Sequence, residues 1–284
     1  MASIIFFDTE IDPKTGKILD IGAVRDDGVI FHRNSIHDFS GFLQGTEFVC
    51  GHNVLSHDMK YVGKAMKTAG IDGSNVIDTL YLSPLMFPKK PYHSLLKDDK
   101  LLADELSNPL NDSEKARELF DSECTAFNAI DEDLKEIYYS LLENTAEFGA
   151  FFRYAGYRGH SSRESGSVSL FMRSLQNMFR PDNSAETADK IKRRFREEIC
   201  INADISGMVR KYPIGLAYCL ALIDALDKSP SVKSVTPPWV LHNYPEVEQL
   251  MFRLRNSPCL EGCPFCNKAF DIHAGLKEWF GFGS

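Results

Sequence analysis

The residues best suited to metal chemistry stand near the start of the chain, where the apolar residues 4–7 are followed by Asp8, Thr9 and Glu10. Because side chains alternate between the two faces of a strand, Asp8 and Glu10 are predicted to point to the same face. Two carboxylates on one face repel each other, and a divalent cation such as Mg²⁺, which prefers oxygen ligands, would relieve that repulsion. The alternative interpretation is a strand that ends in a solvated acidic turn.

Two further acids are predicted to lie where a helix begins. Asp58 follows a Gly-His-Asn segment and a short strand over residues 48–51, and it opens a helix that ends near residue 69. Asp112 is placed in the first turns of a helix that starts at Asn108 and Pro109, since proline favours the first helical turn. From the place of Asp58, a carboxylate can reach the end of a neighbouring strand. For both acids, a purely structural role at a helix N-terminus is the alternative.

The elements that must position these acids are predicted from alternation and turn residues. Residues 18–24 and 29–32 read as strands joined by Asp26-Asp27-Gly28, so they continue the first strand into an antiparallel meander. A short strand over residues 76–80 enters a helix, and Asp78 is interpreted as the cap of that helix. Residues 95–106 have the pattern of an amphipathic helix.

In this order along the chain, the Phe-Asp-Thr-Glu and Gly-His-Asn…His-Asp segments resemble the DEDD superfamily of 3′→5′ exonucleases over roughly residues 1–125. The resemblance implies an α/β domain with a ribonuclease H-like mixed sheet flanked by helices. It also implies that Asp8, Glu10, Asp58 and Asp112 bind two Mg²⁺ or Mn²⁺ ions. Two such ions activate a water and hold the leaving oxygen during phosphodiester hydrolysis.

The general base of this superfamily is not evident. The histidine branch carries a His five residues before its last Asp, where this chain has Ser107, and the tyrosine branch fits no better. His93, on the basic loop 87–93, is therefore the candidate base. Without a base the rate would fall by ~10²–10⁴. A catalytically weak or inactive exonuclease-fold module that binds nucleic acid or a partner is thus the alternative function.

A cysteine cluster near the end of the chain predicts a second metal site. Cys259, Cys263 and Cys266, with His273 beyond them, would satisfy a tetrahedral Zn²⁺ ion. Because no catalytic carboxylate accompanies the cluster, the site is expected to be structural, which makes a zinc-dependent hydrolase the least favoured function. Three free cysteines are the alternative. The remaining cysteines are interpreted as buried free thiols; they are Cys50, Cys124, Cys200 and Cys219.

Beyond the exonuclease-like part, residues 126–255 are predicted to be mainly helical, and residues 256–275 to form the small zinc module. A Gly/Ser-rich loop over residues 156–166 and a basic run over residues 190–196 could contact phosphates. The run continues into glutamates, so a solvated helix face with internal ion pairs is its default interpretation.

The C-terminal residues 276–284 resemble the aromatic motif that opens RecQ-family helicase domains, and the middle region resembles the linking segment of bacterial exonuclease–RecQ-like helicase fusions. This implies the N-terminal portion of such a fusion, in DNA repair or processing, without the helicase domain. No nucleotide-binding loop of the G-x-x-x-x-G-K-[ST] type is present, so this chain should not hydrolyse ATP.

Composition narrows the expected partners. The chain has 284 residues and a net charge of −8, which argues against binding nucleic acid by overall charge alone. No apolar run approaches the ~20 residues that a membrane helix needs, and no secretory signal is recognisable. A cytoplasmic protein is therefore predicted, with single-stranded or 3′-end DNA as its partner and no membrane.

Overall fold

The computed structural model describes residues 2–90, 93, 95, 108–159, 183–225, 236–257, 259 and 262–269. The chain divides into two compact units. The first unit comprises Met1–Ile130 and Leu142–Arg158, and the second comprises Asp131–Leu141 and Gly159–Ser284. Most of the predicted helix over residues 95–106, most of the loop 156–166, His273 and the tail 276–284 lie outside the described residues.

The first unit is built on a five-stranded mixed sheet with the order β3-β2-β1-β4-β5. Its strands are β1 (Ile4–Ile11), β2 (Ile18–Arg25), β3 (Ile30–Arg33), β4 (Phe48–Gly51) and β5 (Val76–Asp78). The first three strands form the predicted antiparallel meander, while β4 runs parallel to β1 and β5 runs parallel to β4. The prediction of an α/β fold with a mixed sheet flanked by helices is confirmed.

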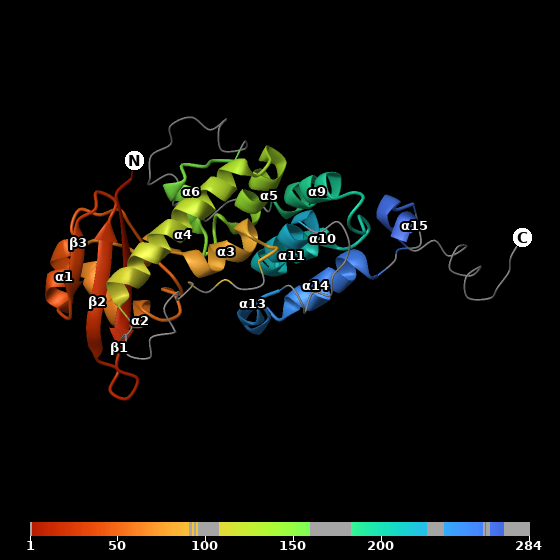
Figure 1. Cartoon of the computed structure of the whole chain (residues 1–284). Helices are drawn as coiled ribbons and strands as arrows, with labels where there is room; N and C mark the ends of the chain where they lie inside the picture. The colour runs from red at the N-terminus through yellow and green to blue at the C-terminus, as the bar shows by residue number, and fades with distance from the viewer. Residues whose placement is uncertain are drawn as a thin grey trace, which may run out of the picture. The chain divides into compact units, whose positions relative to one another are not determined.

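Helices cover both faces of this sheet, and the alternation of β1 decides which residues face which helix. The helices are α1 (Ile36–Phe42), α2 (Met59–Thr68) and α4 (Pro109–Ala129). Ile5 and Phe7 belong to the buried cluster that includes residues of α1 and α2. Phe6 points the other way and meets Phe120 of α4, with 5.7 Å between the ring centroids. Figure 1 shows α4 crossing the strands. Asp8 and Glu10, in phase with Phe6, therefore belong to the α4 face.

Aromatic packing extends the first unit beyond the predicted boundary at residue 125. Phe127 of α4 packs against Phe151 of α6 (Gly149–Tyr154), with ring centroids 5.1 Å apart. Tyr81 of α3 (Thr79–Met86) meets Phe148 edge-on. A short 3₁₀ turn, Gly73–Asn75, precedes β5. Because these rings bury a large apolar area, the segment that contains α6 belongs to the same core as the sheet.

In its described part, the second unit is helical. Its helices are α5 (Glu132–Leu142), α9 (Ser184–Arg194), α10 (Ile205–Lys211), α11 (Pro213–Ala225), α13 (Pro238–Asn243), α14 (Glu246–Arg255) and α15 (Pro264–Ala269). Nearly all of α11 is buried, and it packs against α14 and α10. Among the described residues, no helix combines the length and the apolar character needed to cross a membrane.

Candidate functional site

The centre of the candidate site is a group of three carboxylates at the end of β1. One oxygen each from Asp8, Glu10 and Asp112 lies within 4.8 Å of the other two, and all three residues are half-buried. The strand supplies two of these acids from one face, and the first turn of α4 supplies the third. Oxygen ligands at this spacing suit a hard divalent cation, so the acidic group could bind a metal ion.

A glycine in β2 allows α4 to reach this position. Gly22 stands opposite Asp8 in the β1–β2 ladder, and the backbone of Leu110 lies directly over it. A Cβ atom at Gly22 would lie 2.0 Å from the Leu110 nitrogen, closer than real contacts allow. Asn108 caps the helix by accepting a hydrogen bond from Leu110 N at 3.0 Å, and Pro109 occupies the first turn, as predicted. Because Gly22 has no side chain, the start of α4 can approach β2 closely and place Asp112 next to β1.

Asp58 reaches β1 through the residue between the two strand acids. Its Oδ1 accepts hydrogen bonds from Thr9 N, at 3.0 Å, and from Thr9 Oγ1. Thr9 N is available because β4 pairs with β1 only as far as Phe6. Burial raises the pKa of Asp58, and the Thr9 hydroxyl and the neighbouring His57 oppose that rise. Asp58 is therefore at the predicted strand end, but it is tied to Thr9 and is not one of the three clustered acids.

Asp78 holds the segment that leads to Asp58. It is fully buried, and it caps α3 by accepting a hydrogen bond from Leu80 N at 3.0 Å, as the sequence predicted. It also accepts hydrogen bonds from Asn53 N at 2.8 Å and Leu55 N at 3.0 Å. Burial raises the pKa of Asp78 to about 7. Asn53 has a left-handed backbone, with φ of 64°, which asparagine adopts more readily than most residues. One buried carboxylate thus orders the turn before Asp58.

His93, the candidate general base, is packed against α3. The side chain is 5% exposed, and Nδ1 lies 2.9 Å from Ser83 Oγ. Its Nε2 has no hydrogen-bond partner in the described part of the chain. Burial lowers the pKa of His93 to about 4. The imidazole is therefore neutral at pH 7 and only a weak proton acceptor, because an efficient base has a pKa near the working pH.

A second cluster in the helical unit consists of cysteines. The sulfur atoms of Cys200, Cys259, Cys263 and Cys266 all lie within 4.8 Å of one another. Three of the four were predicted from their spacing. Cys200 was not, because it stands alone far upstream and its surroundings are those of an ordinary buried thiol. This cluster could bind a metal ion.

Two residues of the basic run 190–196, Lys190 and Arg194, are engaged in ion pairs. Lys190 and Arg194 each contact two carboxylates, with the longest of the four distances at 3.1 Å. Their partners are Glu136, Glu186, Asp131 and Asp224. For these two residues the structure supports the default interpretation of a helix face with ion pairs, and only Glu186 among the partners lies on α9 itself.

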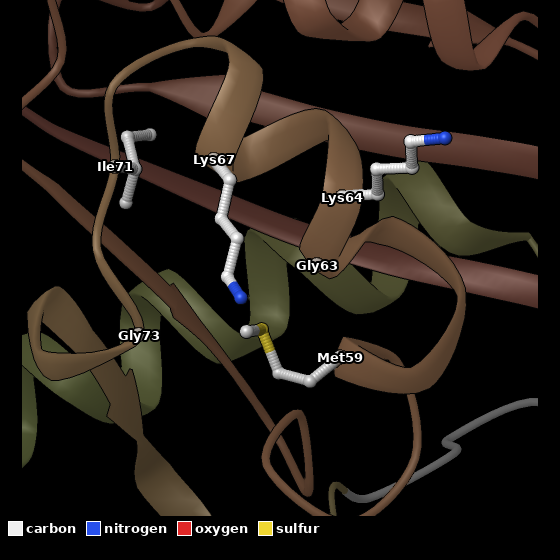
Figure 2. A pocket seen from close by; sticks show the side chains of 6 residues that line it. All are labelled: Met59, Gly63, Lys64, Lys67, Ile71 and Gly73. Atoms are coloured by element: carbon white, nitrogen blue, oxygen red, sulfur yellow. The ribbon is translucent and has the colours of Figure 1, made fainter.

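A pocket of about 370 Å³ lies beside α2 and the turn that follows it (Figure 2). Its lining residues are Met59, Gly63, Lys64, Lys67, Ile71 and Gly73. Figure 2 shows Lys67 extending along the pocket toward Met59, whereas Lys64 is directed away from them. Together with Lys60, these lysines form an exposed stripe at helical spacing, and none of the three is ion-paired with another described residue. The acidic residues of β1 and α4 do not line this pocket.

Comparisons with known proteins identify no relative of this chain. The chain matches no protein-family model, no curated protein sequence and no solved structure. Any functional conclusion therefore depends on the residues and their geometry.

Proposed function

We propose that the protein is a metal-dependent nuclease that removes nucleotides from the 3′ end of DNA, in a ribonuclease H-like domain of the DEDD type. The observation that supports this proposal most directly is the approach of Asp8, Glu10 and Asp112 to within 4.8 Å of one another. Residues far apart in the chain converge at one strand end, and Asp58 is hydrogen-bonded to the same strand. A solvated acidic turn would not require this convergence.

Each acid has a distinct part in the proposed mechanism. Asp8, Glu10 and Asp112 bind Mg²⁺ or Mn²⁺ in this proposal, while Asp58, whose Oδ1 is hydrogen-bonded to Thr9, is left with Oδ2 to contact an ion or its water. Two bound ions would supply a hydroxide at neutral pH and stabilise the charge on the leaving 3′ oxygen. His93 is not assigned the base role in this proposal, because its pKa near 4 makes it a poor acceptor at neutral pH.

The charged side chains of two helices indicate where the DNA substrate would bind. Two cations of α9, Lys190 and Arg194, are already paired with carboxylates, whereas the exposed lysines of α2 are not ion-paired with described residues. The helix α2 begins directly after Asp58. We therefore assign the phosphate contacts of a single strand to Lys60, Lys64 and Lys67, which would position the strand without reading its bases.

The decisive experiment follows the degradation of a 5′-labelled single-stranded DNA in Mg²⁺ and in Mn²⁺. We expect Asp8→Asn and Asp112→Asn to reduce the rate at least ~100-fold, because each removes a charged ligand and metal catalysis contributes several kcal/mol. Asp121→Asn, on an exposed position of the same helix, is the matched control and should retain the wild-type rate. Wild-type activity in Asp8→Asn would refute the assignment.

The second candidate is an inactive module that binds nucleic acid or a partner. The buried, neutral His93 and the absence of a histidine from residues 107–112 favour it. Calorimetric titration with Mn²⁺ separates the two candidates. Tight Mn²⁺ binding that Asp8→Asn abolishes, together with cleavage, supports the nuclease; DNA binding without Mn²⁺ binding or cleavage supports the module.

A zinc-dependent hydrolase that uses the cysteine cluster is the least supported of the candidate functions. A metal bound by four cysteine sulfurs has no open position for a water, and no carboxylate or histidine joins that cluster in the described part of the chain. Cleavage that persists in folded Cys263→Ser would dismiss this function.

A further inference from the structure

The cysteine cluster joins three parts of the second unit. Cys200 lies in the connection between α9 and α10, Cys259 follows α14, and Cys263 and Cys266 stand immediately before and inside α15. The spacing near the end of the chain accounts for three sulfur ligands only. The fold supplies the fourth.

The distances suit a tetrahedral ion. With metal–sulfur bonds of ~2.3 Å, the ligand sulfurs of a tetrahedral zinc site stand ~3.8 Å apart. The four sulfurs here already lie within 4.8 Å of one another without an ion, so contraction by under about 1 Å would complete the coordination. Four uncoordinated thiols gain little from such a convergence, because each is only a weak hydrogen-bond partner.

Hydrogen bonds and packing around Cys200 hold this residue close to the other three cysteines. Cys200 N donates a hydrogen bond of 2.7 Å to Leu254 O, at the C-terminal end of α14. Asn202 Nδ2 lies 3.3 Å from the sulfur of Cys259, where it would donate a hydrogen bond to a thiolate. Phe265 packs against the cluster, and Cys263 is fully buried. These contacts provide the apolar shell and the supporting donor that tune and protect a metal site.

We propose that Cys200, Cys259, Cys263 and Cys266 form a closed structural zinc site, in which Cys200, and not His273, is the fourth ligand. The ion fastens α15 and the segment after α14 to the connection between α9 and α10. With all four positions filled by sulfur, the site stabilises the fold and leaves no place for a substrate. This inference is independent of the nuclease proposal.

The first test needs no variant. Zinc content of the purified, dialysed chain should be about one ion per molecule. X-ray absorption at the zinc edge should show four sulfur neighbours at ~2.3 Å, whereas a site with His273 would show three sulfurs and one nitrogen at ~2.0 Å. A chain without zinc, or with a nitrogen neighbour, would overturn the proposal.

Variants then separate the two ligand sets. We expect Cys200→Ser to lower the bound zinc to a small fraction of one ion per chain, while His273→Ala retains it. Cys219→Ser is the matched control, since Cys219 is a buried cysteine of the same unit that does not belong to the cluster. Loss of zinc in His273→Ala with retention in Cys200→Ser would reverse the assignment.

A proteolysis readout covers the case in which Cys200→Ser folds poorly. Removal of zinc from the wild-type chain with a chelator should speed cleavage after α14, between residues 256 and 269, and added zinc should restore protection. Because anchoring of this segment is attributed to the ion, unchanged cleavage after complete zinc removal would contradict the structural role.

Discussion

At the scale of single residues, Glu123 is a buried carboxylate of the first unit. It lies on α4 with no exposed surface, and neither carboxylate oxygen has a hydrogen-bond partner in the described part of the chain. Burial raises the pKa of Glu123 well above its ordinary value, and the charge of Asp78 adds to the effect. An unpaired buried carboxylate is costly, so the side chain is protonated in the folded protein.

This protonation predicts how stability depends on pH. The folded pKa of Glu123 lies above its unfolded value of 4.5, so the folded state binds the proton more tightly. The contribution of Glu123 to the free energy of unfolding is fully present below pH 4.5. It is lost as the pH rises toward the folded pKa, by up to ~1.4 kcal/mol per pH unit. Asp78, whose pKa is raised to about 7, adds to the slope between about pH 4 and pH 7 in the same direction.

Glu123→Gln tests this prediction, because the amide keeps the shape and cannot ionise. We expect it to reduce the loss of unfolding free energy between pH 5 and pH 9, as measured by urea denaturation. Glu118→Gln, at an exposed position of the same helix, should show the wild-type slope. Equal slopes in Glu123→Gln and the wild type would mean that Glu123 does not titrate in this way.

At the scale of elements, the contact between β2 and α4 decides whether the acids meet. Gly22→Ala would place a Cβ 2.0 Å from Leu110 N and 2.2 Å from the Pro109 carbonyl carbon. Backbone atoms cannot rotate away as a side chain can, so the start of α4 must move and carry Asp112 away from β1. We expect Mn²⁺ binding to weaken and the free energy of unfolding to fall by ~1–3 kcal/mol or more.

Gly41→Ala is the control for this substitution. Gly41 lies in α1, and an added Cβ would meet no atom within 4 Å. Because alanine favours a helix over glycine by up to ~1 kcal/mol, this variant should be slightly more stable and bind Mn²⁺ normally. Calorimetry and thermal unfolding of both variants give the measurement, and normal Mn²⁺ binding in Gly22→Ala would show that α4 tolerates the clash.

At the scale of the whole molecule, a chain with net charge −8 must bind DNA against overall repulsion. The proposed phosphate contacts of Lys60, Lys64 and Lys67 therefore predict a clear salt dependence. Each lost phosphate contact on a single strand should reduce the slope of log K against log salt by ~0.7. Replacing all three lysines with alanine should reduce it by ~2, as measured by fluorescence anisotropy with a labelled oligonucleotide in Ca²⁺.

Replacement of Lys190, Lys192 and Arg193 on α9 is the matched control, because it removes the same charge from another helix. It should change the slope less, since Lys190 already pairs with Glu136 and Glu186 and only Lys192 and Arg193 are left for phosphate contacts. A larger effect on α9 than on α2 would place the DNA on the helical unit instead.

Local sequence determined much of the first unit. The apolar strand that ends in Asp8 and Glu10, the Asn108-Pro109 helix start and the cap at Asp78 each depend on neighbouring residues, and the sequence predicts each of them. The strand boundaries of β3 differ by one residue from the predicted 29–32, since Ile30–Arg33 is the segment that pairs with β2. Propensity and turn chemistry act over a few residues, so they predict elements well.

Only the tertiary structure decided which distant residues meet. No local pattern shows that Gly22 admits α4, that Thr9 takes up one oxygen of Asp58, or that Cys200 joins three cysteines near the end of the chain. These contacts depend on the packing of whole elements, which is set by the total burial of apolar surface and not by short-range spacing. Sequence alone determined which residues could bind metals, and packing decided which of them share one site.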